Sequence, residues 1–489
     1  MSGIKKKFAV GSIWLFVGQN ISNLAGFVIF AVLARILGPL EFGIVAFASV
    51  FIDLSRSFAL AGLPAALIRA PEWDDVAAST SFWGNVGFAI VLIILVGGLG
   101  GFIAGQFYGE QLQWVISALS ICLFIDALRA THEAKLQREF QYKSLAKRTA
   151  FATIGAGIAG IALAFAGFGV WALVINRIAN ATTQTFITWR ATPWTPSRIF
   201  RWDKFKAMFM YGIHLSAAAL FGQINRRVPE LFAGLLINPV AVGFYRVGAR
   251  MVNILFDLTI TPLQRIAMPG FARLDDTAGR VRGFRIVTRF VGLFAFPAFF
   301  GMAALANDLV VLVFGQKWAE SGYILSMLAL VGGVASVSYF VQPLLATTGH
   351  AHIGAIRSFQ LLIVNIVVCV FAAPFGAEAL AMAFAARAYV GVIPTLLLLK
   401  RAVGLPPSRV LRDTFPSFFC ATVMLLIVLA VRVFVLTDYS RLLSIVILVP
   451  LGAIIYASTF LALFRSMLRE IWSDVEPLAA PMVKRLRKP

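Results

Sequence analysis

Acidic residues, cysteines and histidines are all scarce in this chain of 489 residues. There are 22 Asp and Glu, 4 His and 3 Cys, and charged residues of both signs make up only 13% of the sequence. So few cysteines exclude a disulfide framework, and the Cys and His residues show no spacing typical of a metal site. No nucleophile with a neighbouring base and no phosphate-binding loop is recognisable, so the sequence indicates neither an enzyme nor a bound cofactor.

Apolar residues dominate instead. Hydrophobic residues make up 60% of the chain, and the mean hydropathy is +0.86, far above that of a soluble domain. Apolar runs long enough to cross a bilayer recur along the whole chain. The sequence therefore predicts an all-α polytopic membrane protein with about fourteen spans, at roughly 11–35, 41–64, 81–105, 112–129, 149–167, 169–189, 208–236, 240–264, 287–314, 323–346, 358–375, 377–399, 415–436 and 442–464.

The formal net charge of +21 is distributed unevenly along the chain. With the N-terminus inside, the expected cytoplasmic segments hold most of the cations, namely Lys5, Lys6, Lys7, Lys135, Arg138, Lys143, Lys147, Arg148, Arg273, Arg280, Arg282, Arg285, Lys484, Arg485, Arg487 and Lys488. The expected outer loops hold only Arg35, Lys317 and Arg441. This asymmetry follows the positive-inside rule, so it predicts a multi-pass inner-membrane protein with both termini cytoplasmic rather than a nucleic-acid-binding protein.

A short motif recurs two hundred residues apart, each time between two long apolar stretches. Residues 37–43 read LGPLEFG, and residues 237–243 read INPVAVG. Proline stops the preceding helix, and Gly43 or Gly243 is expected to begin the next one, so Pro39 and Pro239 mark equivalent turns, expected on the outer side.

Two further markers recur in the same order at a similar offset. FGVWAL and FGAEAL precede the intramembrane arginines Arg177 and Arg387, and paired aspartates stand at Asp74–Asp75 and Asp275–Asp276. Three markers in one order indicate a duplication of six spans, and an even number gives both halves the same orientation. We expect six spans in 1–200, six in 201–405, and two more with the basic tail in 406–489.

Two of these segments also resemble motifs of a known family. R-x-L-G-P-x-E-F-G at 35–43 and G-F-G-V-W-A-L-V at 167–174 are similar to motifs of polysaccharide-transporter flippases. These include O-antigen and exopolysaccharide repeat-unit flippases of the multidrug/oligosaccharidyl-lipid/polysaccharide exporter superfamily. The resemblance extends to chain length, fourteen spans and the six-plus-six-plus-two layout. It implies V-shaped lobes around a central cavity, lined largely by spans 1, 2, 7 and 8 and opened alternately to each side.

The eighth expected span carries a stripe of polar residues on one helical face. Arg246, Arg250, Asn253 and Asp257 are spaced i, i+4, i+7 and i+11. Charges in a bilayer core are costly, about 2.5–3.5 kcal/mol each, so they usually face a cavity or one another. Two arginines stacked one turn apart repel each other, which favours an anionic ligand over a purely structural role.

Shorter polar stripes occur in spans 1, 2 and 7, which the resemblance also assigns to the cavity. They comprise Gln19 and Asn23, then Asp53 and Arg56, then Gln223, Arg226, Arg227 and Glu230. Asp53 with Arg56, or Arg226 with Glu230, could equally neutralise each other within one helix. Arg177 and Arg387 fit either a bracing role inside each lobe or a place in the cavity.

Guanidinium groups hold phosphate oxygens through paired donors, so the stripes suit a diphosphate headgroup. Together with the resemblance, this predicts a flippase for an undecaprenyl-diphosphate-linked oligosaccharide, moving it from the cytoplasmic to the periplasmic leaflet. A polysaccharide polymerase and chain-length machinery are candidate partners. Proton or sodium coupling stays open, with Asp257, Asp53 and Glu230 as candidate sites.

Three other classes of membrane protein are alternatives to this function. A lipid II flippase fits the same fold and charge. A multidrug or cation antiporter of the superfamily fits the fold, but its cationic substrates favour a cavity dominated by carboxylates. A membrane glycosyltransferase normally carries a sizeable outer loop with catalytic carboxylates, and all expected outer loops here are short.

Overall fold

The computed structural model describes residues 2–59, 62–470 and 473, and within these ranges it contains helices and turns but no β-strand. The all-α class is therefore confirmed for the described chain. The expected basic tail at Lys484, Arg485, Arg487 and Lys488 lies outside it, as do the side chains of Lys5, Lys6 and Lys7. The chain divides into two compact units: unit 1 is Met1–Gly243 with Leu361–Ile366, and unit 2 is Phe244–Gln360 with Val367–Pro489.

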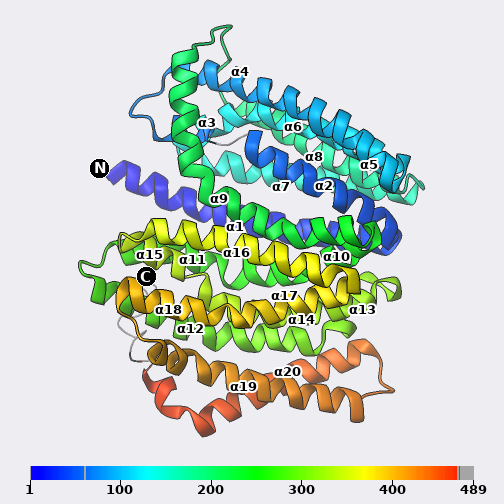
Figure 1. Cartoon of the computed structure of the whole chain (residues 1–489), viewed down its shortest axis with the longest axis vertical. Coiled ribbons are helices and arrows are strands. Elements are labelled where there is room, and N and C mark those ends of the chain that lie inside the picture. The colour runs from blue at the N-terminus through cyan, green and yellow to red at the C-terminus, as the bar shows by residue number, and fades with distance from the viewer. Residues whose placement is uncertain (1, 60–61, 471–472, 474–489) are drawn as a thin grey trace, which may run out of the picture. The chain divides into compact units, whose positions relative to one another are not determined.

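Unit 1 is a helical bundle around α6 (Glu110–Arg138), which contacts α2, α3, α4, α5 and α8. Its other α-helices, labelled in Figure 1, are α1 (Ser2–Ile36), α2 (Pro39–Ala59), α3 (Leu63–Arg69), α4 (Asp75–Leu92), α5 (Gly101–Tyr108), α7 (Tyr142–Phe165), α8 (Val170–Ala191) and α9 (Trp202–Leu236). The π-helical segment η1 (Ile93–Gly100) connects α4 and α5. Small residues allow close packing: an added Cβ at Gly157 of α7 would lie 2.1 Å from Ile29 of α1.

Unit 2 begins within α10 (Pro239–Thr259), whose first residues belong to unit 1. Its further elements in Figure 1 are α11 (Thr261–Ala272), α12 (Thr277–Ala304), α13 (Ala306–Phe314), α14 (Glu320–Ser338), α15 (Val341–Thr347), α16 (Ala351–Ala372), α17 (Ala377–Val390), α18 (Val392–Val403), α19 (Pro407–Phe434) and α20 (Arg441–Leu463), with 3₁₀ turns η2 (Gln316–Trp318) and η3 (Ala373–Phe375).

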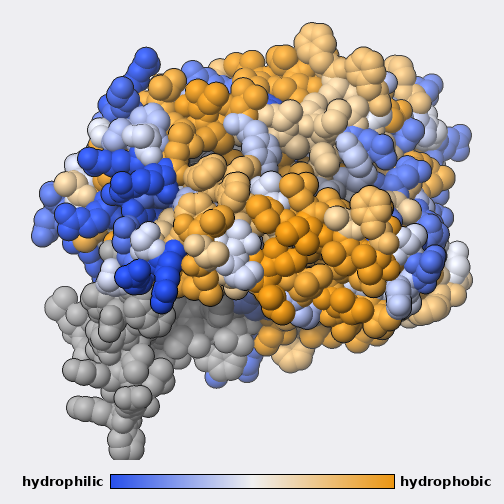
Figure 2. All heavy atoms as spheres, turned by 90° about the horizontal axis from the view of Figure 1, so that it is seen from below, coloured by the Kyte–Doolittle hydropathy of each residue, from blue (hydrophilic) through white to orange (hydrophobic). Residues whose placement is uncertain are grey.

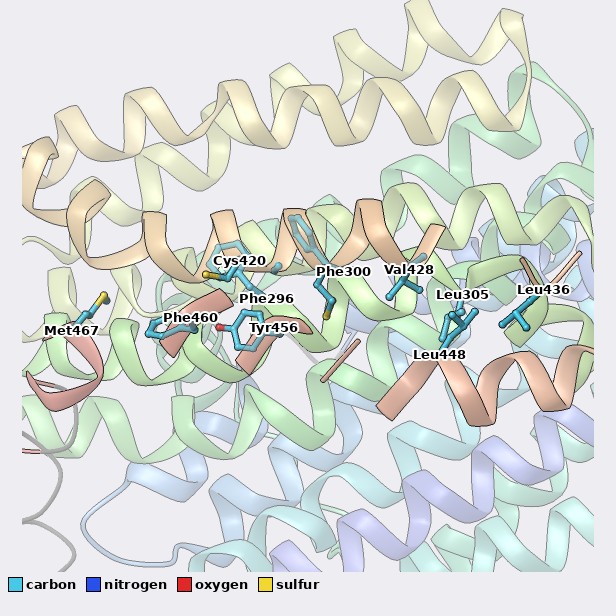
Figure 3. Close-up of a cluster of buried hydrophobic side chains, with 13 residues drawn as sticks. Phe296, Phe300, Leu305, Cys420, Val428, Leu436, Leu448, Tyr456, Phe460 and Met467 are labelled. Atoms are coloured by element: carbon cyan, nitrogen blue, oxygen red, sulfur yellow. The ribbon is translucent and has the colours of Figure 1, made fainter. Parts of the chain in front are cut away.

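The last two long helices, α19 and α20, pack against α12 through an apolar core (Figure 3). Phe296 and Phe300 of α12 meet Cys420 and Met424 of α19 and Tyr456 of α20, all of them buried. Ion pairs add contacts at both ends of α19. Asp413 is bound by Arg285 and Arg289 of α12, and Arg432 is bound to Asp308 of α13.

Ten helical segments of the described chain are long and apolar enough to cross a membrane, or eleven if α2 and α3 form one span. The expected second span is thus broken, because α2 and α3 are bent by 43° relative to each other. The face in Figure 2 shows a broad band of hydrophobic side chains between hydrophilic ends. Such a band suits contact with lipid.

Three expected spans coincide with helices that are long but polar. α8, α9 and α10 are 22, 35 and 21 residues long, and they carry Arg177 and most of the polar stripe residues. At 1.5 Å per residue each is long enough to cross a hydrocarbon core of about 30 Å, but its composition does not by itself indicate a span. The count of fourteen therefore stays a prediction.

The helices repeat in length and order. α1 and α9 are both 35 residues long and α2 and α10 both 21, with each pair offset by 200 residues. Pro39 and Pro239, rather than Gly43 and Gly243 as expected, begin α2 and α10, because proline suits the first position of a helix. Gly169 and Gly376 stand directly before α8 and α17 at φ values of 52° and 102°, which favour glycine. These observations support the duplication.

The two copies of the Pro-x-x-x-Gly motif lie against each other, and the motif residues all belong to unit 1. An added Cβ at Gly43 would lie 1.9 Å from the carbonyl oxygen of Pro239, and one at Gly243 would lie 2.5 Å from that of Pro39. The recurring glycine is therefore required because the two helix starts approach each other by their backbones.

Candidate functional site

Asp53 of α2 is the centre of an ion-pair cluster in unit 1. Its carboxylate contacts Arg177 of α8 and lies 2.6 Å from Arg227 of α9. Arg227 also donates to Glu230, one turn further along α9, at 3.0 Å. The Asp53 cluster therefore joins three helices that are distant in sequence. Arg177 takes part in it, and the choice between its two expected roles, bracing and cavity, stays a prediction.

A second chain of charges crosses unit 1 along α6. Arg56 of α2 binds Asp126 at 3.2 Å, Asp126 binds Arg129 at 2.7 Å, and Arg129 lies 3.3 Å from Glu133. Glu133 in turn accepts from Arg148 of α7 at 3.0 Å. Arg148 is buried, so this residue, expected among the cytoplasmic cations, serves a contact between helices. Arg285, from the same expected set, pairs with Asp413 in unit 2.

These contacts change the pairing considered within single helices. Arg56 pairs with Asp126, whereas Asp53 pairs with Arg177 and Arg227. Glu230 pairs with Arg227 and not with Arg226, its expected partner. Arg226 instead donates a hydrogen bond to Gln223 at 3.1 Å. For Asp53 and Arg56 the reason is geometric, because long side chains in a helical bundle reach partners on adjacent helices as easily as partners one turn away.

The remaining predicted residues of unit 1 lie on α1 and α9. Gln19 donates to Asn23 at 2.9 Å, and both side chains are half-buried. On α9, Gln223 and Arg226 are exposed, whereas Glu230 is only 6% exposed. The polar stripe of α9 thus divides into an exposed part and a buried part.

The α10 stripe is present in unit 2 as one continuous helical face. Arg246, Arg250 and Asp257 are half-buried and Asn253 is exposed, whereas Val247 is buried. Arg250 lies close enough to both Arg246 and Asp257 to interact with them electrostatically. The face therefore combines two stacked guanidinium groups with one carboxylate near the end of the helix.

Arg387 and one arginine that sequence reasoning missed lie on neighbouring helices of unit 2. Arg387 of α17 stands over the ring of Phe384 at 4.5 Å and interacts with Tyr245 of α10. Arg357 of α16 donates a hydrogen bond to Thr395 and is close enough to Arg387 for the two positive charges to repel each other. Arg357 directly precedes the expected eleventh span at 358–375, so a search for charges inside the expected spans does not include it.

The described residues contain no group of three His, Cys, Asp or Glu side chains that could hold a metal ion. At the surface, Asp74 caps α4 by accepting from the backbone of Val76 at 2.9 Å. The hydrogen bond from Lys204 holds the pKa of Asp74 below its ordinary value. The charged groups inside unit 1 instead form ion pairs between helices.

Comparison with known proteins adds a fold and a family to this geometry. The family described as "Polysaccharide biosynthesis protein" matches residues 32–323. The succinoglycan biosynthesis transport protein ExoT of Rhizobium meliloti (strain 1021) is 24% identical, over 95% of this chain and 96% of that protein. The lipopolysaccharide biosynthesis protein WzxC of Escherichia coli (strain K12) is 24% identical over 72% of each chain.

Among solved structures, the lipid II flippase MurJ in an inward closed conformation matches with a TM-score of 0.76 at 14% identity. The match covers 93% of this chain and 100% of that one. At such low identity the likeness concerns the fold alone, and it agrees with the all-helical polytopic fold that the sequence motifs implied.

Proposed function

Because the chain belongs to the polysaccharide biosynthesis protein family, we propose that it is a flippase for a lipid-linked oligosaccharide. Its substrate is a repeat unit on undecaprenyl diphosphate, which it moves by alternating access from the cytoplasmic to the periplasmic leaflet of the inner membrane. The transport role in the name of ExoT, whose sequence aligns with nearly the whole chain, supports a transporter over an enzyme. The translocated repeat unit is then available for polymerisation into polysaccharide.

The observation that carries this proposal is the arginine pair on α10. Arg246 and Arg250 lie one turn apart on a face that is only partly buried, so an incoming group can reach them. A diphosphate carries about two negative charges and offers oxygens to both guanidinium groups, each through paired donors. Binding a dianion there offsets the repulsion between the two arginines, whereas a cationic substrate increases it.

Asp257 is the proposed coupling residue. Asp53 and Glu230, the other two candidates, are held by arginines within unit 1. Asp257 interacts with Arg250 and shares its helical face, so it competes with the substrate for that arginine. Uptake of a proton or a sodium ion by Asp257 removes the competition, which links the ion to substrate binding.

The test measures movement of a sugar-labelled undecaprenyl-diphosphate oligosaccharide across proteoliposomes containing the full chain. We expect R246Q/R250Q to transport about 100-fold less, because each charge-assisted hydrogen bond contributes about 1.5–3 kcal/mol. R246K/R250K keeps both positive charges but lacks the planar guanidinium groups, so its transport rate should lie between those of the wild type and R246Q/R250Q. The matched control is R465Q/R469Q, which removes two exposed arginines beyond α20.

Transport by R246Q/R250Q at the wild-type rate would show that the anion site is wrongly placed. Lipid II serves as a second substrate in the same vesicles. Movement of lipid II without movement of the oligosaccharide would replace the proposed substrate by the peptidoglycan precursor. In cells lacking the protein, the lipid-linked intermediate that accumulates should be the same species that moves in vesicles.

A further inference from the structure

Unit 2 contains a cavity of about 380 Å³ that the proposed transport does not use. It lies between α12, α14, α18 and α19, and its lining is almost entirely apolar, including Phe284, Val337 and Leu396. The hydroxyl groups of Thr395 and Thr414 in the lining donate to carbonyl oxygens of their own helices. The cavity therefore suits an apolar occupant.

The mouth of the cavity opens on the outer surface of the helices. Ile393, Leu411 and Phe415 line it and are 62%, 49% and 52% exposed. These residues belong to helices apolar enough to span a membrane, so their exposed surface meets lipid tails. A volume of this size is at the lower end of the range for ligand sites, about 300–1,000 Å³, and an empty void forfeits dispersion contacts along its whole lining. A flexible hydrocarbon chain from the bilayer has the shape and the apolar character that such a lining favours.

Exposed cations flank the cavity where α18 ends and α19 begins. They are Lys400, Arg401, Arg409 and Arg412. Leu399 and Val410, which are adjacent to them in sequence, line the cavity. Among the residues that the structure describes, none of these four cations forms an ion pair. Arg285 and Arg289 of nearby α12 differ, because Asp413 neutralises both.

We propose that this cavity and its cations form a binding site for an anionic phospholipid, with one acyl chain in the cavity and the phosphate at Arg409 and Arg412. The chain alone gives little selectivity, since lipid tails are as apolar as the lining. The headgroup supplies it, because clustered Lys and Arg side chains at a membrane surface attract anionic lipids. The positive-inside rule places this end of α18 and α19 in the cytoplasmic leaflet. The site does not depend on what the protein transports.

The experiment is native mass spectrometry of the full chain in detergent, titrated with dipalmitoyl phosphatidylglycerol or with dipalmitoyl phosphatidylcholine. The wild type should retain one phosphatidylglycerol more tightly than phosphatidylcholine. R409Q/R412Q should weaken phosphatidylglycerol binding by about 25-fold, since each cation contributes about 1 kcal/mol, a factor of about five. V337F narrows the cavity and should weaken both lipids. R465Q/R469Q removes the same charge elsewhere and should bind as the wild type does.

Equal retention of the two lipids by the wild type, or unchanged phosphatidylglycerol binding by R409Q/R412Q, would overturn the proposal. Undecaprenyl phosphate is added as a competitor. Its displacement of phosphatidylglycerol at lower concentration would assign the cavity to a polyprenyl chain instead. If V337F does not fold, the charge variants alone decide, because Arg409 and Arg412 are exposed and outside any described ion pair.

Discussion

The two units both place arginines in helices expected to cross the bilayer, but they balance the charge differently. Unit 1 pairs Arg56, Arg129, Arg148, Arg177 and Arg227 with Asp53, Asp126, Glu133 and Glu230. In unit 2, α10, α16 and α17 carry Arg246, Arg250, Arg357 and Arg387 against Asp257, and against Glu378 in the first turn of α17.

This difference separates two uses of charge in a membrane protein. In the ion pairs between helices of unit 1, each charge is neutralised by its partner. These pairs maintain the packing of the unit, because moving or removing one partner leaves the other charge uncompensated. An excess of one sign instead creates a potential that attracts a ligand of the opposite sign. Unit 2 contains both uses: Arg285 and Arg289 pair with Asp413, and Arg432 pairs with Asp308, whereas α10, α16 and α17 carry more arginines than carboxylates. The excess on these three helices is the charge that the proposed substrate site uses.

The largest expected effect is a loss of stability in Asp53→Asn. The substitution leaves Arg177 and Arg227 without the carboxylate that joins them, which costs about 3 kcal/mol, the lower end for buried pairs, because Asp53 is 21% exposed. Thermal unfolding in detergent measures it. Asp257→Asn in unit 2 is the matched control, and its stability should change by less than about 1 kcal/mol. Equal losses in the two variants would remove the distinction between the units.

A smaller loss is expected where the two repeat motifs touch. Gly43→Ala brings a Cβ within 1.9 Å of the Pro239 carbonyl oxygen, so the backbones must separate at a cost of about 1–3 kcal/mol. Gly87→Ala on α4 is the control, because no atom lies within 4 Å of its added Cβ. That control should stabilise its helix by up to about 1 kcal/mol. A Gly43→Ala protein as stable as the control would mean that the close approach is not maintained.

The predicted role of Asp257 concerns rate more than stability. In vesicles at a clamped potential, an imposed proton or sodium gradient should accelerate wild-type transport by up to about tenfold, equivalent to about 1.4 kcal/mol. Asp257→Asn should lose this acceleration while still responding to the potential, which drives a dianion outward by about 2.3 kcal/mol per charge per 100 mV. Wild-type transport that follows the potential alone, unchanged in the variant, would contradict ion coupling.

Features that depend only on local helix geometry could be predicted from the sequence. The spacing of Arg246, Arg250 and Asp257 places them on one face of any α-helix, and the structure contains that helix. The partners of Asp53 could not be found in this way, because Arg177 and Arg227 are 124 and 174 residues away in the chain. Which helices lie side by side is a property of the packed bundle.

The charge chain along α6 was overlooked for a different reason. The fourth span was expected to end at residue 129, so Asp126 stood at its edge and Glu133 beyond it. In the structure α6 continues to Arg138, and both carboxylates lie inside one helix. Their i, i+7 spacing is a recognisable signal, but it becomes visible only if a charged segment is allowed to extend an apolar helix.

The smallest expected effect compares equivalent helix caps in the two repeats. Asp74 accepts from Val76 at the start of α4, and Asp276 accepts from Gly279 at the start of α12, at 2.9 and 2.8 Å. Asn caps a helix as well as Asp does, so Asp74→Asn removes mainly the ion pair with Lys204. At a site whose side chain is 43% exposed, this costs at most about 1 kcal/mol, and Asp276→Asn should cost only a few tenths.

The pH dependence of this pair gives the sharper test. Because the folded pKa of Asp74 is lowered, its stabilisation is present above the unfolded pKa of about 3.9 and is lost as the pH falls through the folded pKa. The difference in melting temperature between wild type and Asp74→Asn should therefore be constant near neutral pH and shrink below about pH 4. Equal effects of the two substitutions at every pH would mean that Lys204 adds nothing measurable to the cap, and that the two repeats do not differ at this turn.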